Sequence, residues 1–310
     1  MLTRVIVFGS ALALAGGLFA HRNTAPAMPP QNNATLVNAT APASPDWTAP
    51  FPPHRMIGNI YYVGSKGLAS YLITTPAGHI LINSNLKTSV PLIRESIERL
   101  GFRFNDVKVL LISHAHFDHD GGSAEVKRLT GAKYMVMDGD VDVVESGGKS
   151  DFHYGDDATL LYPAANVDRV LHDGDEVTLG DTTLTAHKTA GHTRGCTTWS
   201  LKVREAGKTY DAVIVGSPNV NPGYKLVNNV TYPEIANDYA RGFRVLKSLP
   251  CDVFLGAHGS YYEMEAKYAK LNTGGTNPYI DPQGYKNYVA DREQAFRSEL
   301  QKQTATAKKQ

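Results

Sequence analysis

Cysteine is almost absent from the 310-residue chain, which contains only Cys196 and Cys251. Two cysteines cannot form the dense disulfide framework of small secreted domains or a zinc site built from four thiolates. A chain of this length can bury a large core without such cross-links. Spacing alone does not reveal how close the two thiols lie, so they are either buried separately or joined in one disulfide.

An excess of charge of one sign is also missing, because 31 Lys and Arg residues stand against 30 Asp and Glu residues and the net charge is +1. Nucleic-acid-binding proteins usually carry a basic stripe, so we expect no nucleic-acid partner. The run of apolar and small residues from Val5 to Ala20 is short for a membrane-spanning helix. It follows Arg4 and precedes small residues, which is the pattern of an export signal. We predict a signal peptide over residues 1–20, with a retained anchor as the alternative, and a periplasmic or secreted mature protein free of the membrane.

Residues 21–45 are rich in Ala, Pro, Asn and Thr without apolar periodicity, which predicts a flexible leader before a single domain, 46–310. Short β-prone runs between Gly and Pro predict strands, and apolar residues at helical spacing predict helices. The predicted strands are 60–63, 70–73, 79–82, 107–112, 133–137, 176–179, 182–187, 197–203, 212–215 and 253–255. The predicted helices are 90–100, 122–129, 233–249 and 290–301. Two sheets between layers of helices would satisfy this order.

The most informative segment is 113–120, SHAHFDHD, directly after a strand predicted to be buried on both faces. His114 and His116 alternate, so extended backbone would point them to one side, whereas the adjacent Asp118 and His119 would point different ways and serve a second metal. A core has no use for so many polar groups at a strand end unless something pairs them. The segment therefore predicts a metal site rather than a solvated polar loop.

Two isolated histidines occur in matching contexts, His192 in the sequence AGHT and His258 in LGAHG. Each follows a β-prone run and has a glycine nearby that lets the backbone turn sharply. Taken singly, either would be interpreted as a structural histidine. Together with the cluster, both are predicted to be metal ligands.

The order H-x-H-x-D-H, then G-H-T, then a late histidine after a strand resembles the metallo-β-lactamase superfamily. The resemblance extends from Trp47 to the C-terminal helix, and it implies a four-layer αββα sandwich with metals at one sheet edge. It also implies two zinc ions. The first would be held by His114, His116 and His192, and the second by Asp118, His119 and His258. Imidazole and carboxylate sites with open positions suit catalytic zinc.

Many other members of the superfamily carry a bridging Asp after the strand that follows G-H-T, and one large lactamase subclass has a Cys ligand there. Here the strand 212–215 continues as GSPN, without either residue. This donor set resembles subclass B3, as do the motifs DFHYG (151–155), GHTRG (191–195), NPGY (221–224) and LPCDV (249–253). Two departures stand out. Asn83 occupies a position where many members have Asp, and Tyr285 stands where related enzymes place the cysteine that pairs with the one in LPCD.

The resemblance implies a zinc-dependent β-lactamase, in which a zinc-bound hydroxide opens the β-lactam amide of penicillins, cephalosporins and carbapenems. Asp118 would be both a ligand and a catalytic group that orients the hydroxide and accepts its proton. The substrate carboxylate would be faced by Ser217, Asn219 and Asn221, and the alternative for each of them is that it caps a turn. We expect a monomer. The alternatives are a lactonase or thioesterase of the same fold, or a periplasmic zinc-binding protein without turnover.

Overall fold

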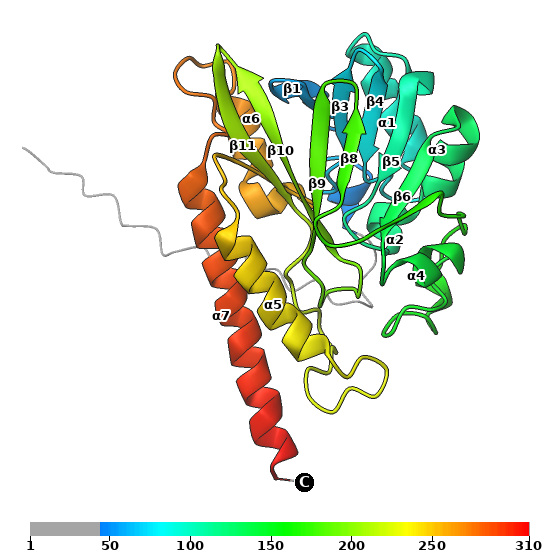
Figure 1. Cartoon of the computed structure of the whole chain (residues 1–310), viewed down its shortest axis with the longest axis vertical. Coiled ribbons are helices and arrows are strands. Elements are labelled where there is room, and N and C mark those ends of the chain that lie inside the picture. The colour runs from blue at the N-terminus through cyan, green and yellow to red at the C-terminus, as the bar shows by residue number, and fades with distance from the viewer. Residues whose placement is uncertain (1–43, 310) are drawn as a thin grey trace, which may run out of the picture. The chain divides into compact units, whose positions relative to one another are not determined.

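Two β-sheets lie face to face between helices in the computed structural model, which describes residues 44–309 (Figure 1). The predicted signal peptide and nearly all of the predicted leader lie outside these residues. Within them, no helix is both long enough and apolar enough to cross a membrane.

The first sheet has seven strands, whose order in space is the order in sequence. They are β1 His54–Ile57, β2 Ile60–Tyr62, β3 Tyr71–Thr75, β4 Gly78–Ile82, β5 Val107–Leu111, β6 Lys133–Met137 and β7 Arg169–Leu171. Strands β1 to β4 pair in antiparallel fashion, whereas β4 to β7 are parallel and need the helical crossovers between them.

The second sheet has five strands in the order β12-β11-β10-β9-β8. They are β8 Glu176–Leu179, β9 Thr182–Lys188, β10 Thr197–Glu205, β11 Lys208–Val215 and β12 Val253–Gly256. Only the β11–β12 pair is parallel. As a result, β9, β11 and β12 all end at the same edge of this sheet.

The core forms on both faces of the first sheet because successive side chains of a strand point to opposite sides. Ile80 and Leu111 point toward the second sheet and join the core between the sheets. Leu72, Leu81 and Leu110 point the other way, into a separate core beneath helices. Nearly continuous apolar strands such as Val107–Leu111, which only Lys108 interrupts, therefore contribute side chains to both cores.

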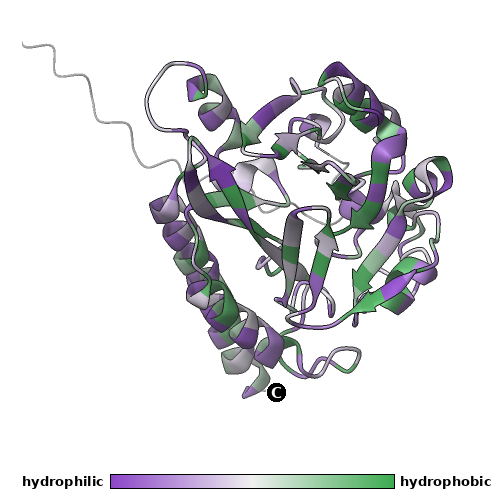
Figure 2. Cartoon of the chain, turned by 45° about the horizontal axis from the view of Figure 1, so that its top comes forward, coloured by the Kyte–Doolittle hydropathy of each residue, from purple (hydrophilic) through white to green (hydrophobic). Residues whose placement is uncertain are grey.

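Helices form the outer layers of the sandwich. They are α1 Val90–Arg99, α2 Phe117–Asp120, α3 Ser123–Thr130, α4 Val141–Glu145, α5 Ile235–Ser248, α6 Met264–Lys270 and α7 Pro282–Ala307. The apolar faces of α1 and α3 join the core beneath the first sheet, and those of α5 and α7 join a cluster that is continuous with the core between the sheets. In Figure 2 the helices carry both hydrophilic and hydrophobic colour, as expected of helices with one buried face. The predicted αββα sandwich is confirmed.

The last helix begins at Pro282, eight residues before the predicted start at 290. The Asp281 side chain accepts a hydrogen bond from the Gly284 N–H at 2.8 Å, and Pro282 occupies the first turn, so the true start carries ordinary helix-start residues. Only Tyr285, Val289 and Phe296 are buried along its 26 residues, which left too sparse an apolar pattern to predict it. Strands β1 and β7 and helices α4 and α6 were not predicted either, because they are short.

Candidate metal centre

His114, His116 and His192 come together at the carboxyl ends of strands from both sheets. His114 and His116 follow β5, and His192 follows β9. Each of the three offers a ring nitrogen within 4.8 Å of the other two, and all three rings are buried. Gly191 permits this approach because its φ is +133°, and a Cβ there would lie 2.6 Å from the Tyr239 ring.

Asp118, His119 and His258 form a second group beside the first. Asp118 Oδ2 lies 3.2 Å from His119 Nε2 and 3.6 Å from His258 Nε2, and the two histidine nitrogens are 3.1 Å apart. A nitrogen of His114 also lies within 4.8 Å of the donors of Asp118 and His119, so the two groups are contiguous.

The prediction that Asp118 and His119 point different ways was wrong. That argument assumed extended backbone, but Phe117–Asp120 is a short helix, α2. On a helix, neighbouring side chains are separated by about 100°, which lets them reach one centre from the same side.

The residues present fit a metal. The donor atoms of His114, His116 and His192 lie within 4.8 Å of one another, as do those of His114, Asp118 and His119, and all of these side chains are buried. Buried donors gathered this closely cost free energy that a bound cation would offset. Imidazole nitrogens with one carboxylate are the donors that catalytic zinc takes.

The electrostatics favour the metal-binding forms of His192, His258 and Asp118. Burial, together with the repulsion of neighbouring histidines, lowers the pKa of His192 to about 3 and that of His258 to about 4. Burial alone would raise the pKa of Asp118, but the adjacent His119 and His258 lower it far below its usual value. Neutral imidazoles and an ionised carboxylate are the forms that bind metal ions.

Asp140 was not predicted from the sequence. It connects the loop that carries His114 and His116 to the loop that carries His192. Its buried carboxylate accepts hydrogen bonds from Ala115 N (2.9 Å), Thr193 Oγ1 (2.8 Å) and Gly195 N (2.7 Å). Burial raises the pKa of Asp140 to about 6, although these donors act to lower it. A lone aspartate after a strand gives no sequence signal for such a role.

Asn83 supports the first loop one residue away from the ligands. Its backbone is left-handed, with φ 66°, and its Oδ1 accepts hydrogen bonds from both the N–H and the hydroxyl of Ser113. Asn83 therefore holds the residue before His114 and not a candidate ligand side chain.

The predicted substrate contacts lie on the segment after β11, and most of their side chains are already engaged. Ser217 is buried, with its hydroxyl 3.2 Å from the hydroxyl of Tyr261, and Asn219 Nδ2 donates to the same hydroxyl at 2.7 Å. The carbonyl of Asn219 accepts a hydrogen bond from His192 Nδ1 at 2.8 Å, which leaves Nε2 of that ring for a metal.

Asn221 donates to the Tyr154 hydroxyl at 2.9 Å, and the Tyr154 ring lies 5.2 Å from that of His116. Of the three predicted substrate contacts, Asn221 is therefore the one whose side chain lies at the border of the metal centre.

A family model for the metallo-β-lactamase superfamily matches residues 67–258, which hold all six candidate ligands. The chain belongs to this superfamily. Among solved structures, it is similar to the FEZ-1 metallo-β-lactamase of Legionella gormanii, with 57% identity, a TM-score of 0.82, and coverage of 83% of this chain and 98% of that one. It is also similar to BJP-1, a subclass B3 enzyme of Bradyrhizobium japonicum, with 40% identity, a TM-score of 0.81, and coverage of 86% and 100%.

A third similar structure is the class B3 di-zinc metallo-β-lactamase LRA-12 from an Alaskan soil metagenome, at 34% identity, a TM-score of 0.80, and coverage of 84% and 99%. A more distant curated relative is a UPF0173 metal-dependent hydrolase of Anaeromyxobacter dehalogenans, 26% identical over 223 residues that make up 68% of this chain and 69% of that protein. Metal use, zinc included, is therefore a property that this superfamily member shares with its relatives.

Both cysteines of this superfamily member are free thiols, so the disulfide alternative is wrong. Cys196 is buried next to the segment after β11, where its Sγ accepts a hydrogen bond from the Ser217 N–H at 3.2 Å. Tyr285, at the position of the usual pairing cysteine, is buried and donates its hydroxyl to the Leu246 carbonyl at 2.6 Å. The buried ring of Tyr285 thus packs at a position where the resemblance had implied a disulfide in related enzymes.

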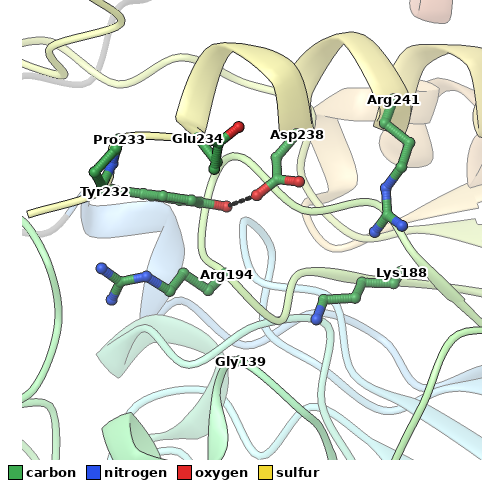
Figure 3. A pocket seen from close by; sticks show the side chains of 8 residues that line it. All are labelled: Gly139, Lys188, Arg194, Tyr232, Pro233, Glu234, Asp238 and Arg241. Carbon is green, nitrogen blue, oxygen red and sulfur yellow. Dashed lines mark hydrogen bonds between the residues drawn. The ribbon is translucent and has the colours of Figure 1, made fainter. Parts of the chain in front are cut away.

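A cavity of about 520 Å³ opens elsewhere on the domain (Figure 3). Its lining residues are Gly139, Lys188, Arg194, Tyr232, Pro233, Glu234, Asp238 and Arg241. None of the six candidate ligands lines it. Three cations are offset there by two carboxylates, so the cavity favours neither anions nor cations.

We expect Asp140→Ala to destabilise the fold markedly. The substitution leaves the Ala115 and Gly195 N–H groups and the Thr193 hydroxyl without their acceptor, and each unpaired buried group costs about 1–3 kcal/mol. The free energy of unfolding of the metal-free protein should fall by at least about 3 kcal/mol in urea titrations. Asp142→Ala, an exposed change on α4, is the control and should stay within about 0.5 kcal/mol. A loss below about 1 kcal/mol for Asp140→Ala would refute this role.

Proposed function

We propose that this protein is an exported zinc-dependent β-lactamase that hydrolyses the β-lactam amide of penicillins, cephalosporins and carbapenems. The observation that carries the proposal is the donor set, in which three histidines lie beside a second group of two histidines and one aspartate. The segment after β11 adds no carboxylate or thiol ligand, because Val215 is followed by Gly216, Ser217 and Pro218. Similarity to enzymes named as metallo-β-lactamases, two of them named as B3, supports this substrate class.

Two zinc ions would be held as the resemblance implies, the first by His114, His116 and His192 and the second by Asp118, His119 and His258. When bound, zinc polarises a carbonyl oxygen and makes water nucleophilic near pH 7. The buried rings exclude bulk water, which strengthens every electrostatic contact in the centre.

Asp118 is the catalytic group that we assign to the chain itself. Its neighbours keep it ionised, because the histidines lower its pKa far below the usual value despite burial. A carboxylate of such low pKa is a weak proton acceptor at neutral pH. We therefore propose that Asp118 mainly orients the attacking water through a carboxylate oxygen, and that it holds the proton only transiently.

We further propose that export precedes activity, with removal of residues 1–20 and function in the periplasm or outside the cell as a monomer. The apolar segment that follows Arg4 supports the proposal of export. N-terminal sequencing of the exported form tests it, and recovery of intact Met1 in a membrane fraction would contradict it.

The metal content of purified protein tests the site assignment. We expect close to two zinc equivalents per chain, and close to one after either His192→Ala or His258→Ala, because each substitution removes one of three donors from one group. Elemental analysis after dialysis against metal-free buffer measures this. A single tightly held metal, with His258 dispensable for metal binding, would contradict the two-zinc assignment.

Asn221→Ala should weaken substrate binding without loss of metal. One N–H of the amide bonds Tyr154, and the second is free to meet the carboxylate that β-lactams carry. A hydrogen bond to a charged group contributes about 1.5–3 kcal/mol, so kcat/KM should fall roughly 10- to 100-fold, largely through KM. Asn237→Ala, an exposed change on α5, is the matched control. Unchanged kcat/KM for Asn221→Ala would remove Asn221 from the substrate site.

A further inference from the structure

Asp151 places a buried carboxylate against one of the candidate ligands. It lies on the long segment between α4 and β7, and its Oδ2 is 3.6 Å from Nε2 of His116. The side chains are 3% and 7% exposed, respectively, so water does not separate them from the rest of the centre. The sequence singled out the motif that contains Asp151 but gave the aspartate no role.

Each of these two atoms is the natural partner of the other. The other oxygen, Asp151 Oδ1, already accepts hydrogen bonds from the N–H groups of His153 (2.8 Å) and Tyr154 (2.7 Å). His116 Nε2 is buried and has no hydrogen-bond partner in the described part of the chain. A small movement of either side chain would form a charge-assisted hydrogen bond, with the ring N–H as donor.

A ring nitrogen that donates its hydrogen to a carboxylate cannot also bind a metal. With Nε2 held by Asp151, the nitrogen of His116 left for a metal is Nδ1. The same arrangement occurs at His192, where Nδ1 is held by the Asn219 carbonyl and Nε2 is left. Outer partners of this kind fix the tautomer and orientation of metal-binding histidines.

Asp151 also connects the metal centre to the neighbouring loop from Lys149 to Asp157. The loop folds tightly on itself, because a Cβ on Gly155 would lie 2.4 Å from the Lys149 carbonyl oxygen and 2.8 Å from that of Asp151. It carries Tyr154, whose hydroxyl accepts the hydrogen bond from Asn221. Contacts thus run from His116 through Asp151 to Tyr154 and Asn221.

We propose that Asp151 is a positioning residue that directs Nδ1 of His116 to the first metal, so that metal binding orders the loop from Lys149 to Asp157 beside the centre. This inference rests on the proposed metal site but not on the proposed substrate, and its tests use metal alone.

Asp151→Asn separates positioning from a purely structural role. The amide oxygen still accepts from the His153 and Tyr154 N–H groups, so the loop turn is retained. The amide NH₂, however, then faces His116 Nε2 and favours the tautomer with hydrogen on Nδ1, which cannot bind metal. Asp156→Asn, an exposed change in the same loop, is the matched control.

We expect Asp151→Asn to weaken zinc binding at the first site about 10- to 100-fold in competition with a chromophoric chelator, with Asp156→Asn unchanged. Proton NMR of the cobalt(II)-loaded protein should show a slowly exchanging ring N–H from His116 that is lost in Asp151→Asn. Zinc should also slow amide hydrogen exchange over 149–157 in the wild type but not in the variant. Wild-type zinc affinity together with a retained N–H resonance in Asp151→Asn would overturn the proposal. Failure to hydrolyse β-lactams would leave these readouts intact and would refute only the proposed substrate.

Discussion

Replacing His116 with alanine should lower kcat/KM for penicillins, cephalosporins and carbapenems by about a thousandfold or more. The substitution removes one of the three donors of the first group, and the first metal is lost with it. Metal polarisation of a carbonyl and activation of water contribute several kcal/mol to the transition state. At about 1.4 kcal/mol for each factor of ten, that loss corresponds to at least three orders of magnitude.

Steady-state kinetics measured together with metal content test this prediction. His172→Ala is the matched control, because its side chain is 68% exposed and its contact is with Asp138 at 3.4 Å, outside the cluster. The control should retain wild-type activity and two metals. A His116→Ala protein that keeps more than about a tenth of the wild-type kcat/KM would show that the first group is not the catalytic centre.

Strong zinc chelators should abolish β-lactam hydrolysis, whereas clavulanate-type inhibitors should leave it unchanged. Those inhibitors trap an acylated serine, and the serines beside the centre are not poised for acylation. Ser113 is buried and donates to Asn83, and Ser217 is buried next to Tyr261. Re-addition of zinc should restore the rate, because the chelator removes the metal without modifying the chain.

A serine mechanism would need a base, and a histidine does contact a serine on the second sheet. His187 Nε2 lies 2.7 Å from Ser200 Oγ. Ser200→Ala therefore serves as the control, and its kcat/KM should equal that of the wild type. Inhibition by clavulanate that disappears in Ser200→Ala, or full activity in the presence of a strong chelator, would contradict zinc-dependent hydrolysis.

The sequence predicted well those features that depend on local pattern. The apolar run Val107–Leu111 and the helical spacing of α5 were recognised because each pattern lies entirely within its own element. The six candidate ligands follow the ends of β5, β9 and β12, and the strand ends meet at one edge. The motif order therefore predicted which side chains meet, although not that α2 would carry two of them.

What the sequence could not predict depends on contacts between distant residues. Asp140 holds Ala115, 25 positions earlier, and Gly195, 55 positions later. Tyr261 forms hydrogen bonds with the Ser217 and Asn219 side chains from more than 40 positions away. No periodicity or motif within either segment records such a partner.

The most direct test of the account is hydrolysis by metal-free protein before and after addition of two equivalents of zinc. Benzylpenicillin, a cephalosporin and a carbapenem should be inert at first and should all be hydrolysed once zinc is added, faster than a simple lactone or a thioester. No turnover of any of the three by zinc-loaded protein, or faster turnover of the lactone or thioester, would contradict the proposed function and favour another hydrolase of the same superfamily.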